Sequence, residues 1–421
     1  MEPNETPWLK IDARTKSVSI DPTHPEFYND PYAAYERIRP VAPAFYWEEQ
    51  RLWCFMNAAD VGAILRDRRF GRELLPLEGQ PMPEAKPASP HLAAFNAVNR
   101  DSMLEREPPV HTRLRTLVNR AFVSRNIERL RPRILSLAHG LVDRMKSSDH
   151  AELIGAYATP IPVVVIAELL GVPSDMSEQL VDWSHRMVAV FQLGRTRGME
   201  DEAESATREF SSFLRGYFAE RRRKPADDLI SHLLNVEATG ERLTEDEMIA
   251  TCILLLNAGH EGTVHSIGNA VKTLLEKGSD TRAAFAGEAA TEATVEECLR
   301  YDPPLHMFNR FAQEDTQVAG ITLKRGTEIA LMYGAANRDP AKYPRAEVFD
   351  PGRPVMGAAS AHASFGGGIH FCLGAPLARL ELQIALPVLF ERLPGLFLRG
   401  RPLYRDTYHF HGLTSLEVGW P

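Results

Sequence analysis

Several features of membrane-spanning, secreted or nucleic-acid-binding proteins are missing from this chain. No apolar run reaches the roughly 20 residues that cross a bilayer. The first residues, Met1–Glu5, lack the basic start and apolar run of a signal peptide. The net charge is −8 over 421 residues, so there is no basic excess for nucleic acid. We therefore expect a cytoplasmic protein that binds neither membranes nor nucleic acid.

Cysteine is scarce as well. The four cysteines are far apart and form no Cys-x-x-Cys pair, which argues against a disulfide framework and against a cysteine-based zinc site. The chain also has no long Gly/Ser tract, no low-complexity block and no internal repeat. Although the length alone suggests roughly two or three domains, the absence of a linker favours one domain over residues 1–421.

The pattern that is present is mainly helical. Apolar residues recur at i, i+3 and i+4 spacing through much of the chain, which predicts amphipathic helices. Thr244 and Glu247 form a capping box that opens a long apolar helix ending near Glu276. The other expected helices cover residues 31–39, 58–65, 126–145, 161–170, 177–192, 202–223, 227–234, 291–301 and 375–390.

A small β part accompanies these helices. Two aromatic-rich runs at residues 44–47 and 51–55 are separated by three polar residues, which is typical of a hairpin. Residues 309–333 read as short strands with turns at Gly320 and Gly326. The sequence therefore predicts a mainly α protein with a large helical body and a small β-rich part.

The most informative stretch runs from Phe365 to Gly374 and places Cys372 in a glycine-rich loop just before the last helix. Glycines can take positive φ and let the backbone lie close to a flat ligand. The free amides and dipole of a helix start favour a thiolate over a thiol. A thiolate held this way suits heme iron. The alternative is a catalytic or buried cysteine in an ordinary glycine-rich loop.

The spacing Phe-Gly-x-Gly-x-His-x-Cys-x-Gly resembles the heme-thiolate signature of the cytochrome P450 monooxygenases. The resemblance covers nearly the whole chain and implies the P450 fold, with heme b as cofactor and Cys372 as the metal ligand. It also implies heme contacts from Phe365, Gly366 and Gly374. The missing membrane anchor resembles the soluble bacterial branch of the family.

A second motif, His111-x-x-x-Arg115, puts two cationic donors on one helix face. The two propionates of heme need charge-assisted donors. The resemblance assigns this role to His111 and Arg115, together with Arg310 and His370. For each histidine, the alternative is a structural side chain whose hydrogen bonds are satisfied within the protein.

Glu297 and Arg300 form a Glu-x-x-Arg motif whose side chains share a helix face. Taken alone, this motif is most often a surface ion pair that adds little stability. Its position before the cysteine loop matches the buried Glu–Arg pair of the family, which Arg353 joins. The resemblance implies that these three residues serve folding and heme retention rather than catalysis.

The central helix carries the sequence Ala258-Gly259-His260-Glu261-Gly262-Thr263. Its glycines cost about 1 kcal/mol each relative to alanine, and we expect them to open a groove over the heme. The family places an acid followed by threonine here, and this pair brings water protons to dioxygen. Glu261 keeps the acid, but Gly262 stands at the usual threonine position. Thr263 lies one residue later, about 100° further round the helix. Which group supplies the hydroxyl of the proton relay is therefore left open.

Together these features predict a heme-thiolate monooxygenase that uses dioxygen and oxidises a small apolar organic substrate. The chain has no flavin or iron–sulfur motif of its own, so the resemblance implies electrons from a ferredoxin and its reductase, with Arg379 on the docking face. Ordinary core packing is the alternative for the expected substrate-pocket residues, which are Leu255, Leu305, His306, Met307, Phe308, His411 and Leu413.

Two other functions remain open at this stage. Gly262 motivates a peroxide-using peroxygenase, or an enzyme whose substrate donates the missing hydroxyl. A heme sensor or electron-transfer protein is the other alternative. It would need a filled or closed distal side, and the open groove expected at Gly259 and Gly262 argues against it.

Overall fold

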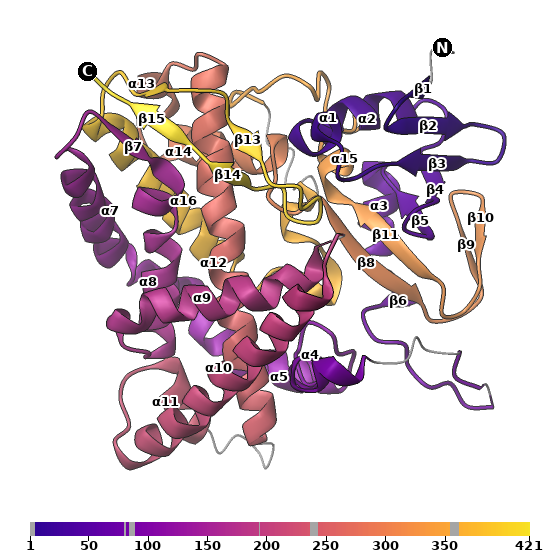
Figure 1. Cartoon of the computed structure of the whole chain (residues 1–421), viewed down its shortest axis with the longest axis horizontal. Coiled ribbons are helices and arrows are strands. Elements are labelled where there is room, and N and C mark those ends of the chain that lie inside the picture. The colour runs from indigo at the N-terminus through magenta and orange to yellow at the C-terminus, as the bar shows by residue number, and fades with distance from the viewer. Residues whose placement is uncertain (1–4, 80, 84–88, 193, 236–242, 354–361) are drawn as a thin grey trace.

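The computed structural model describes residues 5–79, 81–83, 89–192, 194–235, 243–353 and 362–421. A large helical body lies beside a smaller β-rich part (Figure 1), which confirms the expected fold class. The α-helices are α1 (Pro25–Asn29), α2 (Pro31–Ile38), α3 (Ala58–Ile64), α4 (Ala93–Arg100), α5 (Val110–Asn119), α6 (Ser124–Glu128), α7 (Arg131–Met145), α8 (Pro160–Leu170), α9 (Ser177–Val188), α10 (Arg197–Arg223), α11 (Leu229–Asn235), α12 (Glu245–Glu276), α13 (Thr281–Ala284), α14 (Glu288–Tyr301), α15 (Tyr333–Asn337) and α16 (Ala375–Arg392).

The strands form one large sheet and three small ones. The large sheet has the order β1-β2-β3-β4-β5-β11-β8-β6, and the small sheets are β9 with β10, β13 with β14, and β12-β15-β7. The strands are β1 (Glu5–Thr6), β2 (Leu9–Asp12), β3 (Ser17–Ile20), β4 (Ala44–Trp47), β5 (Leu52–Phe55), β6 (Phe70–Gly71), β7 (His150–Glu152), β8 (Met307–Ala312), β9 (Thr316–Val318), β10 (Ile321–Leu323), β11 (Glu328–Met332), β12 (Phe397–Leu398), β13 (Leu403–Tyr404), β14 (Leu413–Ser415) and β15 (Glu417–Gly419).

The large sheet joins segments that are far apart in the sequence. The expected hairpin is present, with Ala44 opposite Phe55 and Trp47 opposite Leu52. Strand β5 then pairs in parallel with β11, which comes more than 250 residues later and carries its own antiparallel partner β8. This pairing fixes β8 beside the helical body, and β8 supplies two residues of the site described below.

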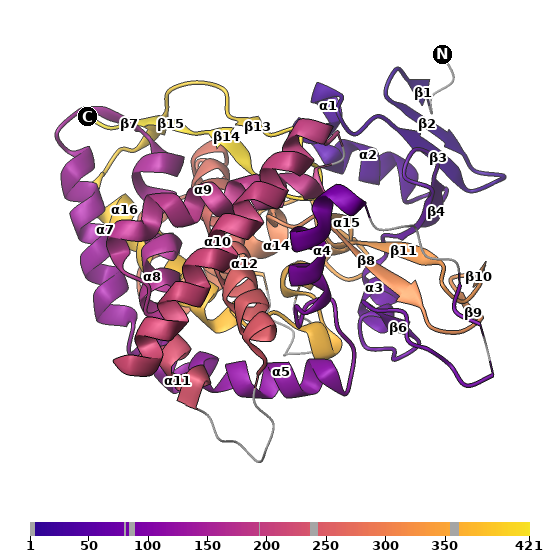
Figure 2. The ribbon, with the colours of Figure 1, turned by 60° about the horizontal axis from the view of Figure 1, so that its bottom comes forward.

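Helix α12 runs through the middle of the helical body (Figure 1). Its capping box is formed as expected, because Thr244 N donates to Glu247 Oε2 over 2.9 Å and Glu247 N donates to Thr244 Oγ1 over 3.1 Å. It packs against α8, α14 and α16, and α9 and α10 cross over it (Figure 2). A helix covered on most sides is buried nearly all round. Even so, no helix in the described ranges is both long and apolar enough to cross a bilayer.

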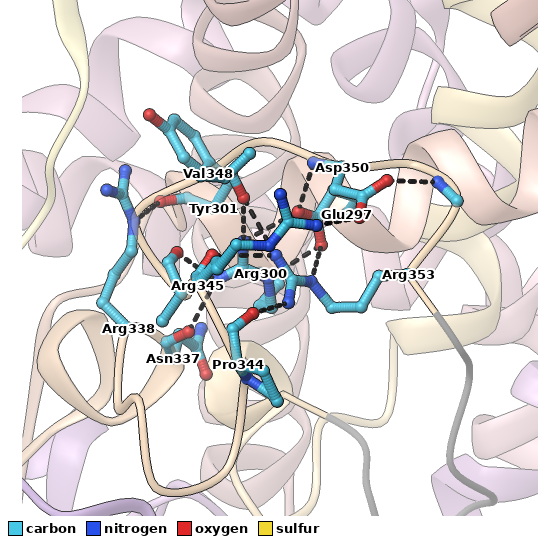
Figure 3. A network of polar contacts seen from close by, with 12 residues as sticks. Glu297, Arg300, Tyr301, Asn337, Arg338, Pro344, Arg345, Val348, Asp350 and Arg353 are labelled. Carbon is cyan, nitrogen blue, oxygen red and sulfur yellow. Dashed lines mark hydrogen bonds and ion pairs between the residues drawn. The ribbon is translucent and has the colours of Figure 1, made fainter.

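The Glu297–Arg300 pair is buried and joins a larger polar network (Figure 3). Arg300 donates from Nε and Nη2 to the two oxygens of Glu297, over 2.7 Å each. Arg353 Nε donates to Glu297 Oε2 over 3.4 Å, while Arg300 Nη1 donates to the carbonyls of Asn337 and Ala346. The sequence motif is therefore not a surface ion pair, since its members tie α14 to the segment that leads toward the cysteine loop.

We predict that Glu297→Gln lowers the free energy of unfolding by about 3–5 kcal/mol, because it leaves the buried guanidinium of Arg300 and the partly buried one of Arg353 without their counter-charge. Urea denaturation followed by circular dichroism would measure the loss. Glu128→Gln is the matched control, since Glu128 pairs with Arg131 at the exposed surface and should change stability by less than about 1 kcal/mol. Equal effects of the two substitutions would contradict a structural role for the buried pair.

Candidate active site

The glycine-rich loop before α16 has a fixed shape. Cys372 N donates to Phe365 O over 2.9 Å, which closes the loop on itself. Gly366 and Gly368 have φ values of 67° and 65°. A Cβ on Gly368 would lie 2.0 Å from the Leu65 carbonyl oxygen, so the loop tip can approach Leu65 only as glycine.

Cys372 is half-buried, and Gly374 is the N-cap of α16. Burial raises the pKa of the Cys372 thiol, although the amides of Gly374 and Ala375 and the Arg115 guanidinium lower it. The helix start therefore acts in the direction expected from the sequence, but burial outweighs it in the chain alone. A cation bound at Sγ would reverse that balance, because a coordinating thiol is deprotonated.

A deep cavity lies between this loop and α12. Its empty space is ≈ 1530 Å³, counting its mouth into solvent. The walls come from the cysteine loop, α5, α12, β8 and the start of α16. The residues predicted from the sequence that line it are Leu255, Ala258, Gly259, Glu261, Gly262, Thr263, Leu305, Phe308, Arg310, His111, Arg115, Phe365, Gly366, His370, Cys372 and Gly374.

The four predicted propionate donors all reach this cavity. His111 and Arg310 are buried, and the rings of His111 and His370 lie 4.6 Å apart. His111 Nδ1 has no hydrogen-bond partner among the described residues. Arg115 Nη2 donates to Phe371 O over 2.6 Å, which ties α5 to the cysteine loop.

The electrostatics of these donors fit a bound dianion. Burial, His370 and Arg115 together lower the pKa of His111 to about 4. Burial also lowers the pKa of Arg115 and of Arg310. Glu107 Oε1 lies 2.9 Å from His370 Nε2, but Arg115 and Arg310 remain partly or fully buried cations, which are costly unless an anion joins them. The unpartnered Nδ1 of His111 and this cluster therefore suit the two propionates of heme, with Cys372 close to the same cavity.

Two of the three glycines of α12, Gly259 and Gly262, have different surroundings. Both line the cavity, but a Cβ on Gly259 would lie 3.0 Å from Ile166 Cγ1, so Gly259 allows α8 to pack closely. A Cβ on Gly262 would meet nothing within 4 Å. The expected open groove is thus centred on Gly262. Its carbonyl accepts the Ser266 hydroxyl over 2.7 Å, and α12 continues as a helix through this point.

Glu261 forms part of the wall between this cavity and a second, outer pocket, since it lines both. Its Oε1 lies 3.2 Å from His185 Nε2, and its Oε2 lies 3.2 Å from His265 Nε2. Burial raises the pKa of Glu261, but the two histidines outweigh it and hold the pKa well below its usual range. The sequence analysis missed both histidines. His265 follows Glu261 by four residues and could have been found on that spacing, whereas His185 comes from α9.

Thr263 is buried and lies beside Glu381, a residue of α16 that the sequence analysis also missed. Both side chains line the cavity. Burial raises the pKa of Glu381 to about 8, although the Thr263 hydroxyl lowers it. Glu381 is therefore mostly protonated at neutral pH, and the cavity holds one charged and one neutral carboxyl group on different helices.

Four of the predicted pocket residues do not line the cavity as described. Met307 and Leu413 belong to the hydrophobic core. His306 is buried between the hydroxyls of Tyr32 and Tyr35, at 3.3 Å and 3.0 Å. His411 Nε2 lies 3.4 Å from Asp302 Oδ1. Both histidines therefore serve a buried polar network rather than a cavity wall, because tyrosines from α2 occupy the space around them.

Arg379 is half-buried and already paired. Its Nε and Nη2 donate to the two oxygens of Glu296 over 2.5 Å and 2.9 Å, and its guanidinium lies over the Phe365 ring at 4.5 Å. Docking a partner through Arg379 would compete with this pair. Its environment thus favours the structural role over the docking role.

Comparison with known proteins shows which family this chain belongs to. The cytochrome P450 family model matches residues 73–279 and 289–396. The biotin biosynthesis cytochrome P450 of Bacillus subtilis is 35% identical over 396 residues, covering 93% of this chain and 97% of that protein. Cytochrome P450 monooxygenase PikC of Streptomyces venezuelae is 34% identical, covering 94% and 92%. The structure of P450BioI in complex with an acyl carrier protein that carries hexadec-9Z-enoic acid has a TM-score of 0.86 and 35% identity, covering 94% and 100%.

We predict that Arg310→Met weakens heme retention by roughly 10- to 100-fold, because one propionate loses a buried charged donor worth about 1.5–3 kcal/mol. Transfer of heme to an excess of a heme-scavenging globin would measure the loss rate. Arg133→Met is the control, since Arg133 pairs with Glu168 at the surface. A transfer rate equal to that of wild type would argue against propionate binding by Arg310.

The raised pKa of Glu381 predicts that the free energy of unfolding depends on pH. Its pKa is raised from 4.5 to about 8 in the folded chain, so the folded state holds one more proton than the unfolded state between these values. Stability should therefore fall as pH rises through this window, by up to about 1.4 kcal/mol per pH unit. Glu381→Gln should flatten this slope in urea titrations at pH 6, 7 and 8. Glu391→Gln, an exposed position on the same helix, should leave it unchanged, and a slope that survives in Glu381→Gln would contradict the assignment.

Proposed function

The chain belongs to the cytochrome P450 family and is a heme-dependent monooxygenase, and we propose that it oxidises an apolar organic substrate with dioxygen and electrons from a separate redox partner. The observation that carries this proposal is the position of Glu261, a charged acid in the wall of an otherwise mainly apolar cavity that also contains Cys372. A mainly apolar cavity suits an apolar substrate, and Glu261, the charged one of its two acids, can supply protons.

The character of the walls supports an apolar substrate. On the α12 side, most of the surface is contributed by aliphatic and aromatic side chains, and binding sites of this kind gain affinity from apolar burial. The P450BioI structure holds a long acyl chain, which suggests fatty acyl groups as the first substrates to test. The side chains concerned are Ile166, Leu254, Leu255, Leu305 and Phe308.

Five residues would hold the heme. Cys372 would ligate the iron, and His111, Arg115, Arg310 and His370 would bind the propionates. When bound, heme supplies the iron chemistry that activates dioxygen for insertion into a C–H bond. Gly366 and Gly368 take positive φ in the cysteine loop, and Gly368 lets the loop tip approach Leu65.

Glu261 would pass protons from solvent into the cavity. His185 is 46% exposed and Glu261 only 6%, so a proton can enter at the imidazole and reach the carboxylate over 3.2 Å. The low pKa keeps Glu261 ionised at neutral pH, so its carboxylate can accept hydrogen bonds from water in the cavity. On the cavity side, Gly262 leaves space for water next to Glu261.

Electrons would come from a ferredoxin and its reductase. The cysteines other than Cys372 are buried and belong to different elements, β5, α12 and α14. They offer no cluster that could hold an iron–sulfur centre. An electron donor must therefore dock from outside.

Gly262 supports a second candidate function on the same fold. The position that normally supplies a hydroxyl next to the acid has no side chain, and open space replaces it. An enzyme that uses hydrogen peroxide, or one whose substrate carries the hydroxyl, would not need that group. Thr263 does not settle the choice, since its hydroxyl lies beside Glu381.

We expect free fatty acids to shift the heme spectrum of the purified protein and to be hydroxylated in the presence of dioxygen, NADH, ferredoxin and its reductase. Leu305→Ala should raise the apparent Kd by about tenfold, since a leucine side chain contributes about 1.5–3 kcal/mol when buried. Leu403→Ala, at an exposed leucine, is the control. Product formation with hydrogen peroxide alone, and none with dioxygen, would favour the peroxygenase instead.

Two substitutions in α12 test the proton route. Glu261→Gln should slow dioxygen-driven turnover by about 10²-fold, the scale of a lost acid–base group, and should spare peroxide-driven turnover because peroxide already carries both protons. Gly262→Thr should improve the ratio of product to NADH for substrates that lack a hydroxyl. Tight coupling in wild type with such substrates, together with full activity of Glu261→Gln, would refute the route.

A further inference from the structure

The outer pocket beside Glu261 is a site in its own right. It is formed by α9, the residues just after α9, α12 and the segment before β14, and it opens to solvent. Glu261 is shared with the inner cavity, but the histidines of the pocket are not. Its lining residues are His185, Val188, Ala189, Phe191, Gln192, Glu261, His265, Arg405, Thr407, His409 and Phe410.

His260 does not line this pocket, but it lies behind two residues that do, His185 and Glu261, and one of its ring nitrogens is unused. Its Nδ1 is 2.8 Å from the carbonyl oxygen of Leu256, which can only accept, so Nδ1 carries the proton. Nε2 therefore presents a lone pair. It is buried, at 1% exposure of the residue, and has no hydrogen-bond partner among the described residues. A buried polar atom without a partner costs about 1–3 kcal/mol, and it points to a group that binds there.

The unused nitrogen faces two further ligand atoms. His260 Nε2 lies 3.8 Å from Glu261 Oε1, and His185 Nε2 lies 3.2 Å from the same oxygen. All three atoms are within 4.8 Å of one another. Ligand atoms around a tetrahedral zinc ion, each about 2.0–2.1 Å from the metal, are roughly 3.3 Å apart. Small side-chain rotations would bring the three atoms to that spacing.

Neighbouring groups hold these three ligands in orientations that suit a metal site. The backbone carbonyl of Leu256 holds the His260 ring by its other nitrogen, which fixes both tautomer and orientation. His265 Nε2 lies 3.2 Å from Glu261 Oε2 and so orients the carboxylate while Oε1 faces the other two ligands. His185 is partly exposed and gives an ion a way in from solvent.

We propose that His185, His260 and Glu261 bind a divalent transition-metal ion such as Zn²⁺, with water in the fourth position. Two imidazoles and one carboxylate are a ligand set that zinc uses in open sites, and imidazole ligands favour Zn²⁺, Cu²⁺ and Ni²⁺ over Mg²⁺ and Ca²⁺. The bound ion occupies the carboxylate oxygen and the imidazole that face solvent. It therefore blocks proton entry through Glu261 and slows dioxygen-driven turnover, a consequence that rests on the function proposed above.

Calorimetric titration of the untagged, heme-loaded protein with ZnCl₂ tests the binding site. We expect one high-affinity ion per chain and no comparable binding of MgCl₂. His185→Gln and His260→Gln should each weaken zinc binding at least tenfold. His185 is half-exposed, so His185→Gln remains informative if the buried substitution disturbs folding. His150→Gln, at an exposed histidine far from the pocket in the sequence, is the control. Zinc affinity that is unchanged in both site variants overturns the proposal.

A turnover experiment tests the consequence separately. Each variant is measured with and without ZnCl₂, and its rate is expressed relative to its own zinc-free rate. In wild type, zinc should slow dioxygen-driven turnover at least fivefold and leave peroxide-driven turnover unchanged, while His185→Gln should lose this sensitivity. If zinc binds through the two histidines but does not slow turnover, the metal site is supported and the proton route is overturned. Absence of binding overturns the metal site alone, because the Glu261→Gln experiment still tests the proton route.

Discussion

An interior cavity can persist in a helical protein only if its walls are held apart by something other than its contents. Here both walls, α12 and the cysteine loop, are held in place by packing and hydrogen bonds within the protein. Helix α12 is packed against α8, α14 and α16, and the buried Glu297–Arg300–Arg353 network ties α14 to backbone carbonyls of the segment that precedes the cysteine loop. The loop itself is closed by the bond from Cys372 N to Phe365 O. The position of the cysteine sulfur therefore follows from contacts that need no cofactor.

The same walls carry buried polar groups that a bound anion would stabilise. Burial lowers the pKa of His111, Arg115 and Arg310 on one side of the cavity. On the α12 side, histidines hold the pKa of Glu261 low. A bound dianion can stabilise the side with the two arginines, whereas Glu261 already has imidazole partners, one of which, His185, reaches solvent. The cavity thus has one side that would hold the cofactor and another that would supply protons. The two sides differ because α5 and β8 carry the arginines, whereas α12 carries Glu261.

What the sequence could predict depended on how local the signal was. The cysteine loop, the capping box at Thr244 and the Glu297–Arg300 pair each lie within ten residues, so spacing alone placed them on one turn or one face. The parallel pairing of β5 with β11 had no local signal, because it joins segments that the sequence separates widely. His185 was missed for the same reason: α9 reaches Glu261 only through the crossing of helices. Glu381 was missed because an acid on an apolar helix carries no mark that it faces a cavity.

The histidines show most clearly where sequence reasoning ends. Among the residues that the structure describes, two clusters combine two histidines with one acid: His185–His260–Glu261 and Asp302–His306–His411. In the second cluster, tyrosine hydroxyls supply hydrogen bonds to both Asp302 and His306, so its polar atoms are satisfied by the protein and it is a structural network. In the first, His260 Nε2 is left without a partner and a half-exposed imidazole leads to solvent. Both clusters have the same composition, so residue types cannot distinguish them. Only the neighbours that fold around each cluster decide which one is complete and which one can accept a ligand.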